Sequence, residues 1–155
     1  MEIGDLLTQD GGIVLRGAAS SKRQALHAVA EAAGAALNIA PQRVFDALME
    51  REALGSTGLG SGVAVPHARL SGLEHVSGVF VRLDAPVAYG AVDDRPVDLM
   101  FALFAPPSDG AGHLRALAAV SRAMRSPELR ERLRQARSED AVRALFVPQE
   151  TSTAA

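Results

Sequence analysis

A nine-residue apolar segment, Val97–Ala105, most limits the folds that are open to this chain of 155 residues. Asp98 is its only charged residue, and the proline pair Pro106-Pro107 follows it. A run of this length and polarity predicts a central strand with both faces covered, since one exposed face would require alternating polar residues. We therefore expect a layered α/β structure with this segment in the middle of its sheet.

The rest of the chain supplies helices and shorter strands that fit such a fold. Ser21 with Gln24 three residues later is a capping-box pattern that predicts a helix start. Pro41 is well suited to the first position of a second helix. The order of elements predicts a single-domain α/β sandwich with a mixed β-sheet flanked by helices. The expected elements are strands at 12–16, 63–65, 76–83, 87–89 and 97–105, helices at 3–7, 21–37, 41–52 and 113–124, and short helices that open at 126 and 138.

Composition is that of an ordinary single globular domain, with 48% hydrophobic and 22% charged residues and a net charge of −2. Without a basic excess we expect no nucleic-acid partner. Without a stretch of about 18 apolar residues we expect no membrane insertion. The lack of cysteine and of a visible signal peptide predicts a cytoplasmic protein. We expect one folded domain over residues 1–148 and a flexible C-terminal tail over 149–155.

The most distinctive local feature is a glycine-rich stretch that leads into a histidine. Four glycines fall between Gly55 and Gly62, the apolar segment Val63–Val65 follows, and Pro66-His67 comes next. Glycine lets another molecule approach the main chain closely, and proline ends a strand. We therefore expect a bare, flexible loop beside one imidazole held at a strand end.

Several glycine-rich motifs fail here for chemical reasons. Ser61 stands where a P-loop needs its lysine, so the phosphates of a nucleotide would lack their point charge. Val63 replaces the last glycine of a dinucleotide fingerprint, and this loop precedes its strand. Leu54 and Leu59 replace the first glycine of a nucleophile elbow around Ser56 and Ser61.

Histidine as a nucleophile is the chemistry that stays open. His67 could bind a metal together with His75 or His113, but no carboxylate has the spacing of a known zinc site, so we expect no metal and no cofactor. A neutral imidazole nitrogen can instead attack phosphorus and become phosphohistidine. That transfer needs positioning and charge stabilisation. Arg51 before the loop, and His113 at a helix start that favours anions, are candidates to supply both.

The residues around His67 resemble the signature of the mannitol/fructose-type enzyme IIA domains of bacterial phosphotransferase systems. That signature has an acidic or amide residue, six residues, an aliphatic residue, glycine, two residues, and then aliphatic-Ala-aliphatic-Pro-His-small. Segments 51–58, 96–99 and 113–117 further resemble the nitrogen-regulatory branch, and the likeness covers about residues 2–147. The signature positions are filled by Glu52, Leu59, Gly60, Val63, Ala64, Val65, Pro66, His67 and Ala68.

This resemblance implies an enzyme IIA type-2 domain that works as a phosphocarrier of the nitrogen-regulatory phosphotransferase system. By the resemblance, an HPr-like carrier phosphorylates His67 at Nε2, His113 supports the phosphoryl group and Arg51 neutralises it. Regulatory target proteins are the further partners that it implies. The loop residues expected to bind phosphate or to shape the turn are Ser56, Thr57, Gly58 and Gly60.

Two other functions stay open. A sugar-specific enzyme IIA that passes phosphate to a IIB domain, for fructose- or mannitol-type uptake, would use the same site. The 155 residues contain no IIB or IIC region, which favours the free-standing regulator. A non-catalytic binding module is the second alternative, and the intact site argues against it. Docking of a protein partner needs a water-excluding patch, which we expect around Leu59, Val63 and Leu70.

Overall fold

A six-stranded mixed sheet forms the centre of the protein, which the computed structural model describes over residues 2–7 and 11–147. Its strands are β1 (Ile13–Gly17), β2 (Gly58–Gly60), β3 (Val63–Ala64), β4 (His67–Arg69), β5 (Ser77–Val87) and β6 (Val97–Ala105). The order across the sheet is β1-β5-β6-β3-β2, and β4 also pairs with β6. Pairs β1–β5, β3–β6 and β4–β6 are parallel, whereas β5–β6 and β2–β3 are antiparallel. The predicted α/β sandwich with a mixed sheet is confirmed.

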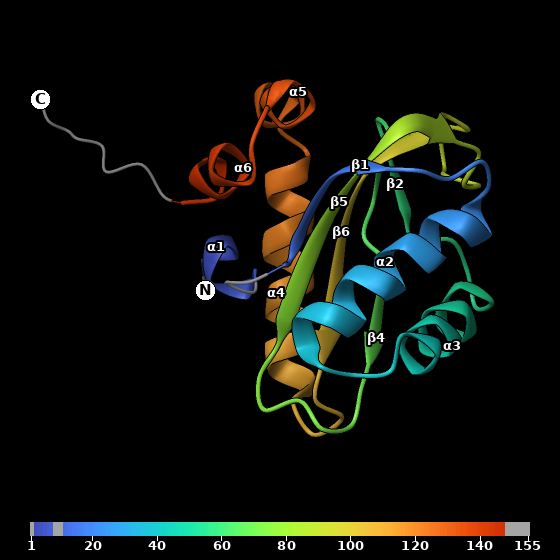
Figure 1. Cartoon of the computed structure of the whole chain (residues 1–155), viewed down its shortest axis with the longest axis vertical. Helices are drawn as coiled ribbons and strands as arrows, with labels where there is room; N and C mark the ends of the chain where they lie inside the picture. The colour runs from blue at the N-terminus through green and yellow to red at the C-terminus, as the bar shows by residue number, and fades with distance from the viewer. Residues whose placement is uncertain (1, 8–10, 148–155) are drawn as a thin grey trace, which may run out of the picture.

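Helices cover both faces of this sheet. They are α1 (Ile3–Leu6), α2 (Lys22–Leu37), α3 (Pro41–Glu52), α4 (Gly110–Met124), α5 (Pro127–Gln135) and α6 (Glu139–Leu145). Helices α2 and α3 lie on one face, and α4 lies on the other together with α1, α5 and α6 (Figure 1). The predicted helix starts are confirmed at Ser21, whose hydroxyl accepts a hydrogen bond from the amide of Gln24 at 3.1 Å, and at Pro41.

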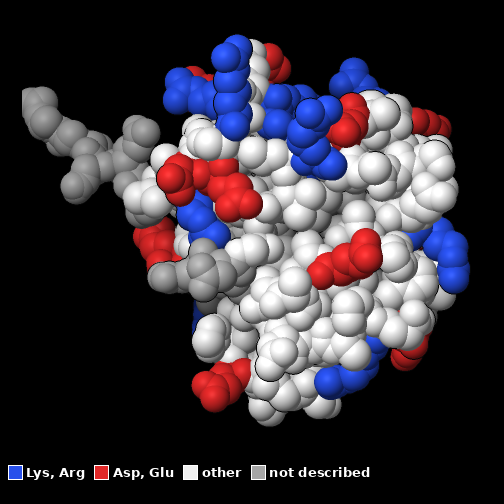
Figure 2. Space-filling model, in the orientation of Figure 1, with Lys and Arg blue, Asp and Glu red and all other residues white. Residues whose placement is uncertain are grey.

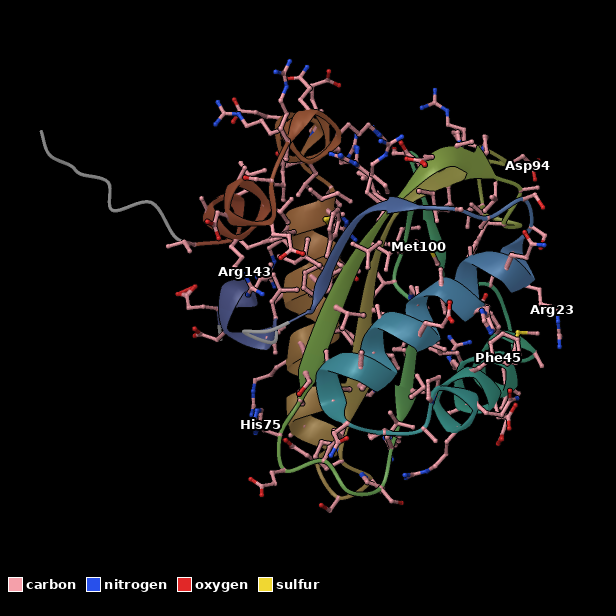
Figure 3. All side chains as sticks on the ribbon, in the orientation of Figure 1. Arg23, Phe45, His75, Asp94, Met100 and Arg143 are labelled. Carbon is pink, nitrogen blue, oxygen red and sulfur yellow. The ribbon has the colours of Figure 1, made fainter. Side chains whose placement is uncertain are left out.

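Strand β6 occupies the central position predicted for residues 97–105. Met100 and Phe104 belong to the apolar cluster under α2 and α3, and Leu99, Phe101 and Leu103 belong to the cluster under α4. All five are fully buried, and Figure 3 shows Met100 in the middle of the sheet. Side chains alternate between the faces of a strand, so two covered faces favour apolar residues at successive positions, and only Asp98 near the start of β6 is charged.

The glycine-rich stretch differs from its prediction as a bare loop. Its second half is β2, which forms a hairpin with β3 across the two-residue turn Ser61-Gly62. Both turn residues have positive φ, 57° and 83°, a geometry that matches the twist of a tight hairpin and favours glycine. Asp93 Oδ2 accepts a hydrogen bond from the amide of Ser61 at 2.8 Å, and this contact across the turn stabilises a structured hairpin.

The sequence predicted that the strand ends at Pro66, but hydrogen bonding to β6 continues through this residue. Proline has no amide proton to donate, but Pro66 pairs with β6 through its carbonyl, which accepts a hydrogen bond from the amide of Leu103 at 2.9 Å. Strand β4 then begins at once with His67, whose register partner is Leu103. The histidine therefore lies at the start of a paired strand.

Two further element boundaries were wrong. Strand β5 continues through Pro86 to Val87, so the separate strand predicted at 87–89 does not form. Helix α4 begins at Gly110, earlier than the predicted start at His113, because the Asp109 carboxylate accepts a hydrogen bond from the amide of Gly112 at 2.8 Å. The expected C-terminal tail, 149–155, lies outside the described residues.

Charge is unevenly spread on the face seen in Figure 2. Lys and Arg side chains gather at the end of the molecule that carries α5, and most of the remaining face is uncharged. Part of the charge on α5 is balanced within the helix, where Arg132 pairs with Glu128 at 3.7 Å.

We expect Gly78→Ala to lower the free energy of unfolding by about 1–3 kcal/mol, because it overpacks the core. A Cβ at this position of β5 would lie 2.7 Å from Cε1 of Phe101 and 3.2 Å from the carbonyl oxygen of Ala102. Urea denaturation measures the change. Gly110→Ala is the matched control, because the nearest atom to its Cβ is an Arg69 guanidinium nitrogen at 4.0 Å. Equal stability of the two variants would contradict the prediction.

Candidate active site

The imidazole of His67 is held in one tautomer by two hydrogen bonds. Its Nδ1 lies 2.9 Å from the carbonyl oxygen of Val65, which can only accept, so Nδ1 carries the proton. Its Nε2 accepts a hydrogen bond from Nε–H of Arg51 at 3.2 Å. Both contacts require a neutral ring whose free lone pair is on Nε2. The half-buried ring therefore presents Nε2 as its nucleophilic atom.

Burial is the main cause that lowers the pKa of His67 below its ordinary value of 6.5. The nearby guanidinium of Arg51 lowers this pKa further, whereas the hydrogen bond to Val65 and the charge of Glu52 raise it. The net direction is downward, so His67 is neutral and nucleophilic at neutral pH.

Arg51 reaches the histidine from the last turn of α3. Its Nη1 donates a hydrogen bond to the carbonyl oxygen of Gly55 at 2.9 Å, while its Nε contacts His67. The guanidinium is thus fixed between the loop and the imidazole. The structure brings these two predicted site residues together.

His113 lies beside them in the first turn of α4. Its ring centroid is 5.4 Å from that of His67, with the two rings inclined at 56°. Its side chain is buried, and Nδ1 has no hydrogen-bond partner within residues 2–7 and 11–147. Burial lowers the pKa of His113, as do His67 and Arg69, and Asp109 opposes the shift. The site therefore holds two neutral imidazoles.

The loop residues predicted to bind phosphate or shape the turn make hydrogen bonds away from the imidazole. Ser56 Oγ donates to the carbonyl oxygen of Tyr89 at 3.3 Å and accepts from the amide of Gly58 at 3.1 Å. Gly60 has a φ of 98° at the hairpin. These contacts shape the turn, and phosphate binding by Ser56, Thr57, Gly58 or Gly60 stays a prediction.

A buried polar cluster lies directly behind Arg51. The Glu52 carboxylate pairs with Lys22 Nζ at 2.7 Å, accepts hydrogen bonds from the amide and hydroxyl of Thr57, and lies 3.3 Å from the hydroxyl of Tyr89. Burial and the charge of Glu52 raise the pKa of Tyr89, so its hydroxyl stays protonated. The sequence signature marks Glu52, but nothing in the sequence singles out Lys22 or Tyr89.

A pocket of about 510 Å³ opens over the two imidazoles. Leu54, Leu114 and Leu117 form what we name the apolar rim, in which Leu54 is 83% and Leu114 68% exposed. The patch predicted around Leu59, Val63 and Leu70 was wrong. Val63 and Leu70 are core residues with 1% and 3% exposure, and Leu59 lines a different pocket beside Ser61 and Arg125.

The described residues give no sign of a metal site or a membrane span. Within 2–7 and 11–147, no three His, Asp or Glu side chains gather in a way that could hold a metal ion. No helix in the same part of the chain has both the length and the apolar character needed to cross a membrane.

Comparison with known proteins shows the family to which the chain belongs. Residues 6–147 match the family described as "Phosphoenolpyruvate-dependent sugar phosphotransferase system, EIIA 2". The chain therefore belongs to the enzyme IIA type-2 family and is a component of a phosphotransferase system.

Within that family, nitrogen regulatory proteins are close relatives. The chain is 42% identical to the one from Bradyrhizobium diazoefficiens over 79% of this chain and 80% of the relative. It is 41% identical to the nitrogen regulatory protein from Escherichia coli K12, over 77% of this chain and 74% of the relative. The crystal structure of IIA-Ntr from Neisseria meningitidis superposes with a TM-score of 0.86 at 34% identity, covering 94% of this chain and 99% of that one.

We expect Arg51→Ala to raise the pKa of His67, because the variant removes a positive charge that disfavours the imidazolium ion. A pH titration of the imidazole signals by NMR measures the shift. Arg43→Ala is the control, since Arg43 lies on the same helix and donates to the carbonyl oxygen of Ser71. An Arg51→Ala titration that coincides with the wild-type curve would reject the contact.

Proposed function

We propose that the protein is a cytoplasmic phosphocarrier of the nitrogen-regulatory phosphotransferase system. It accepts a phosphoryl group on Nε2 of His67 from an HPr-like carrier and regulates target proteins through its phosphorylation state. The observation that supports this most directly is the pair of contacts from Val65 and Arg51, which leave the lone pair of a neutral His67 on Nε2.

The bonds and electron pairs of the proposed phosphoryl transfer balance between His67 and the donor histidine. The Nε2 lone pair attacks phosphorus, a nitrogen–phosphorus bond forms on His67, and the corresponding bond to the ring of the donor histidine breaks. The electron pair of the broken bond returns to the donor ring. The proton on Nδ1 of His67 stays in place, and the Val65 carbonyl stabilises the positive charge that the phosphorylated ring acquires.

Two neighbours can stabilise the charge of the transferring group. Nε–H of Arg51 now lies on the line of attack, so the guanidinium has to turn from Nε2 towards the phosphoryl oxygens during transfer. The ring of His113 is close enough to His67 to contact the same oxygens. Its low pKa makes it a neutral hydrogen-bonding group that does not compete as a second cation.

The apolar rim supports docking of a protein donor. Leu54 and Leu114 are large exposed apolar side chains that line the same pocket as His67, and they belong to the loop after α3 and to α4. A donor that covers both would exclude water from the reacting nitrogen, which strengthens the electrostatic contacts of Arg51.

Transfer to a sugar-system IIB domain is the alternative that this site also permits. The relatives include a fructose-specific EIIA component of Haloferax volcanii, 36% identical over 63% of this chain and 64% of the relative. The higher identity to nitrogen regulatory proteins favours the regulatory role. Rapid passage of phosphate from His67 to a IIB domain would favour sugar transport instead.

We expect His67→Ala to abolish uptake of acid-labile phosphate from a phosphorylated HPr-like carrier, because the accepting nitrogen is gone. His113→Ala should retain the acceptor but slow uptake by about 10²-fold, the lower bound for a lost group of this kind. Uptake is measured by intact-protein mass spectrometry over time.

His75→Ala is the control for loss of an imidazole, because His75 is exposed and Figure 3 shows it at the end of the sheet, on the segment before β5. Acid-labile phosphate on His67→Ala would overturn the assignment of the acceptor. An unchanged rate for His113→Ala would reject its supporting role.

Charge on the apolar rim should weaken docking of the donor. We expect Leu54→Asp and Leu114→Asp each to raise the Kd for an HPr-like carrier at least about tenfold, or about 1.4 kcal/mol, because a desolvated carboxylate would face the partner. Isothermal titration calorimetry measures Kd. Val92→Asp is the control, since Val92 is 92% exposed and does not line the His67 pocket. Equal Kd values for all three variants would exclude the apolar rim as the docking surface.

A further inference from the structure

Thr57 joins the two segments that contact His67. Its amide donates to Glu52 Oε2 at 3.0 Å, and its hydroxyl donates to Glu52 Oε1. Its carbonyl oxygen accepts a hydrogen bond from the amide of Val65 at 3.0 Å. Through these bonds one residue ties the end of α3 to the segment that leads into β4.

The Glu52 carboxylate is a fixed anchor for this residue. Its side chain is only 4% exposed, and Lys22 Nζ pairs with it at 2.7 Å. The same ammonium group lies 4.6 Å from the ring centroid of Tyr89, whose hydroxyl is 3.1 Å from Thr57 Oγ1. A buried charge that is fully paired and hydrogen-bonded in this way has few alternative positions, because any displacement exposes an unpaired group to a nonpolar interior.

Both hydrogen-bond partners of His67, Arg51 and Val65, are held in place through Glu52 and Thr57. Arg51 precedes Glu52 in α3 and is held by the carbonyl oxygen of Gly55, inside the loop that Thr57 closes. Val65, which fixes the Nδ1 proton of His67, is the residue bonded to Thr57. Displacement of Thr57 would therefore shift both neighbours of the imidazole.

We propose that Thr57 is a positioning residue, whose hydroxyl locks the loop onto Glu52 so that Arg51 and Val65 hold His67 at its two ring nitrogens. The proposal rests on the proposed function for its meaning in phosphoryl transfer. It also assigns Thr57 a role other than that of a phosphate ligand. The hydroxyl has one proton, which it donates to Glu52, and the side chain is buried.

Thr57→Val is a clean test, because it deletes the hydroxyl and keeps the branched shape, the amide and every charge. The charged and titratable groups around His67 are Glu50, Arg51 and Glu52 from α3, Arg69 from β4 and His113 from α4, and the variant retains all of them. The main-chain hydrogen bond between Thr57 and Val65 is also retained, so the Val65 contact that raises the pKa of His67 stays in place. A guanidinium that moves away from Nε2 then leaves the imidazole easier to protonate. The pKa of His67 should therefore rise in the variant.

The experiment compares wild type, Thr57→Val and Thr57→Ser by NMR titration of His67 and by the rate of phosphate uptake from a phosphorylated HPr-like carrier. We expect Thr57→Val to raise the pKa of His67 and to slow uptake about tenfold to a hundredfold, the cost of slight misplacement of a catalytic group. Thr57→Ser keeps the hydroxyl and should restore both values.

A matched control separates positioning from stability. Ser126→Ala removes the hydroxyl that caps α5, where Ser126 accepts from the amide of Leu129 at 3.1 Å. It should lower the melting temperature and leave the pKa of His67 and the uptake rate unchanged. Tyr89→Phe removes a single hydroxyl from the Glu52 cluster and should shift the pKa of His67 upwards by less, which provides a second test if Thr57→Val does not fold.

Two results would overturn the proposal. An unchanged pKa of His67 together with an unchanged rate in Thr57→Val means that the hydroxyl positions nothing. A slower rate with an unchanged pKa means that Thr57 contacts the phosphoryl group directly. If the wild-type protein takes up no phosphate, the proposed function fails, and the NMR comparison still decides whether Thr57 positions Arg51.

Discussion

The structure depends on β6 keeping a hydrogen-bonded partner on both of its edges. β5 occupies one edge, and β3 and β4 share the other on either side of Pro66. The Pro66 carbonyl bonded to Leu103 keeps this edge paired where an amide is missing. As a result His67 is set by the register of a central strand buried on both faces. A reactive group on a sheet is held more precisely than one on a loop.

The surroundings of His67 fit two opposing requirements of the proposed phosphoryl transfer. A nucleophilic imidazole must be neutral before transfer, yet the phosphorylated ring is a cation next to a dianionic group. Burial and Arg51 favour the neutral ring, whereas the Val65 carbonyl favours the charged one. Because the carbonyl contacts only Nδ1, it stabilises the cation without occupying Nε2. The two requirements are met on different nitrogens of the same ring.

Long elements could be predicted from the sequence because they carry periodic or capping signals, as β6 and α2 do. The hairpin of β2 and β3 could not, because strands of three and two residues have no measurable period. Its turn at Ser61 is held by Asp93 and by Arg134, which are 32 and 73 residues away. Contacts between residues far apart in the sequence also limit what could be predicted of the site. A local signature marks His67, whereas Lys22 reaches Glu52 only once α2 packs beside α3.

The position of the apolar rim beside His67 would let a target protein distinguish the phosphorylated from the unphosphorylated form. Phosphorylation of Nε2 would add a phosphoryl group of about −1.5 to −2 charges, by analogy with other phosphorylated side chains, while the ring itself gains one positive charge. Leu54 and Leu114 border the same pocket as His67, so a partner that covers them must also desolvate that charge. Arg51 carries its positive charge before and after the transfer, so the surface still becomes more negative. A target that binds the unmodified surface would then lose affinity through desolvation alone, and regulation would need no change in the fold.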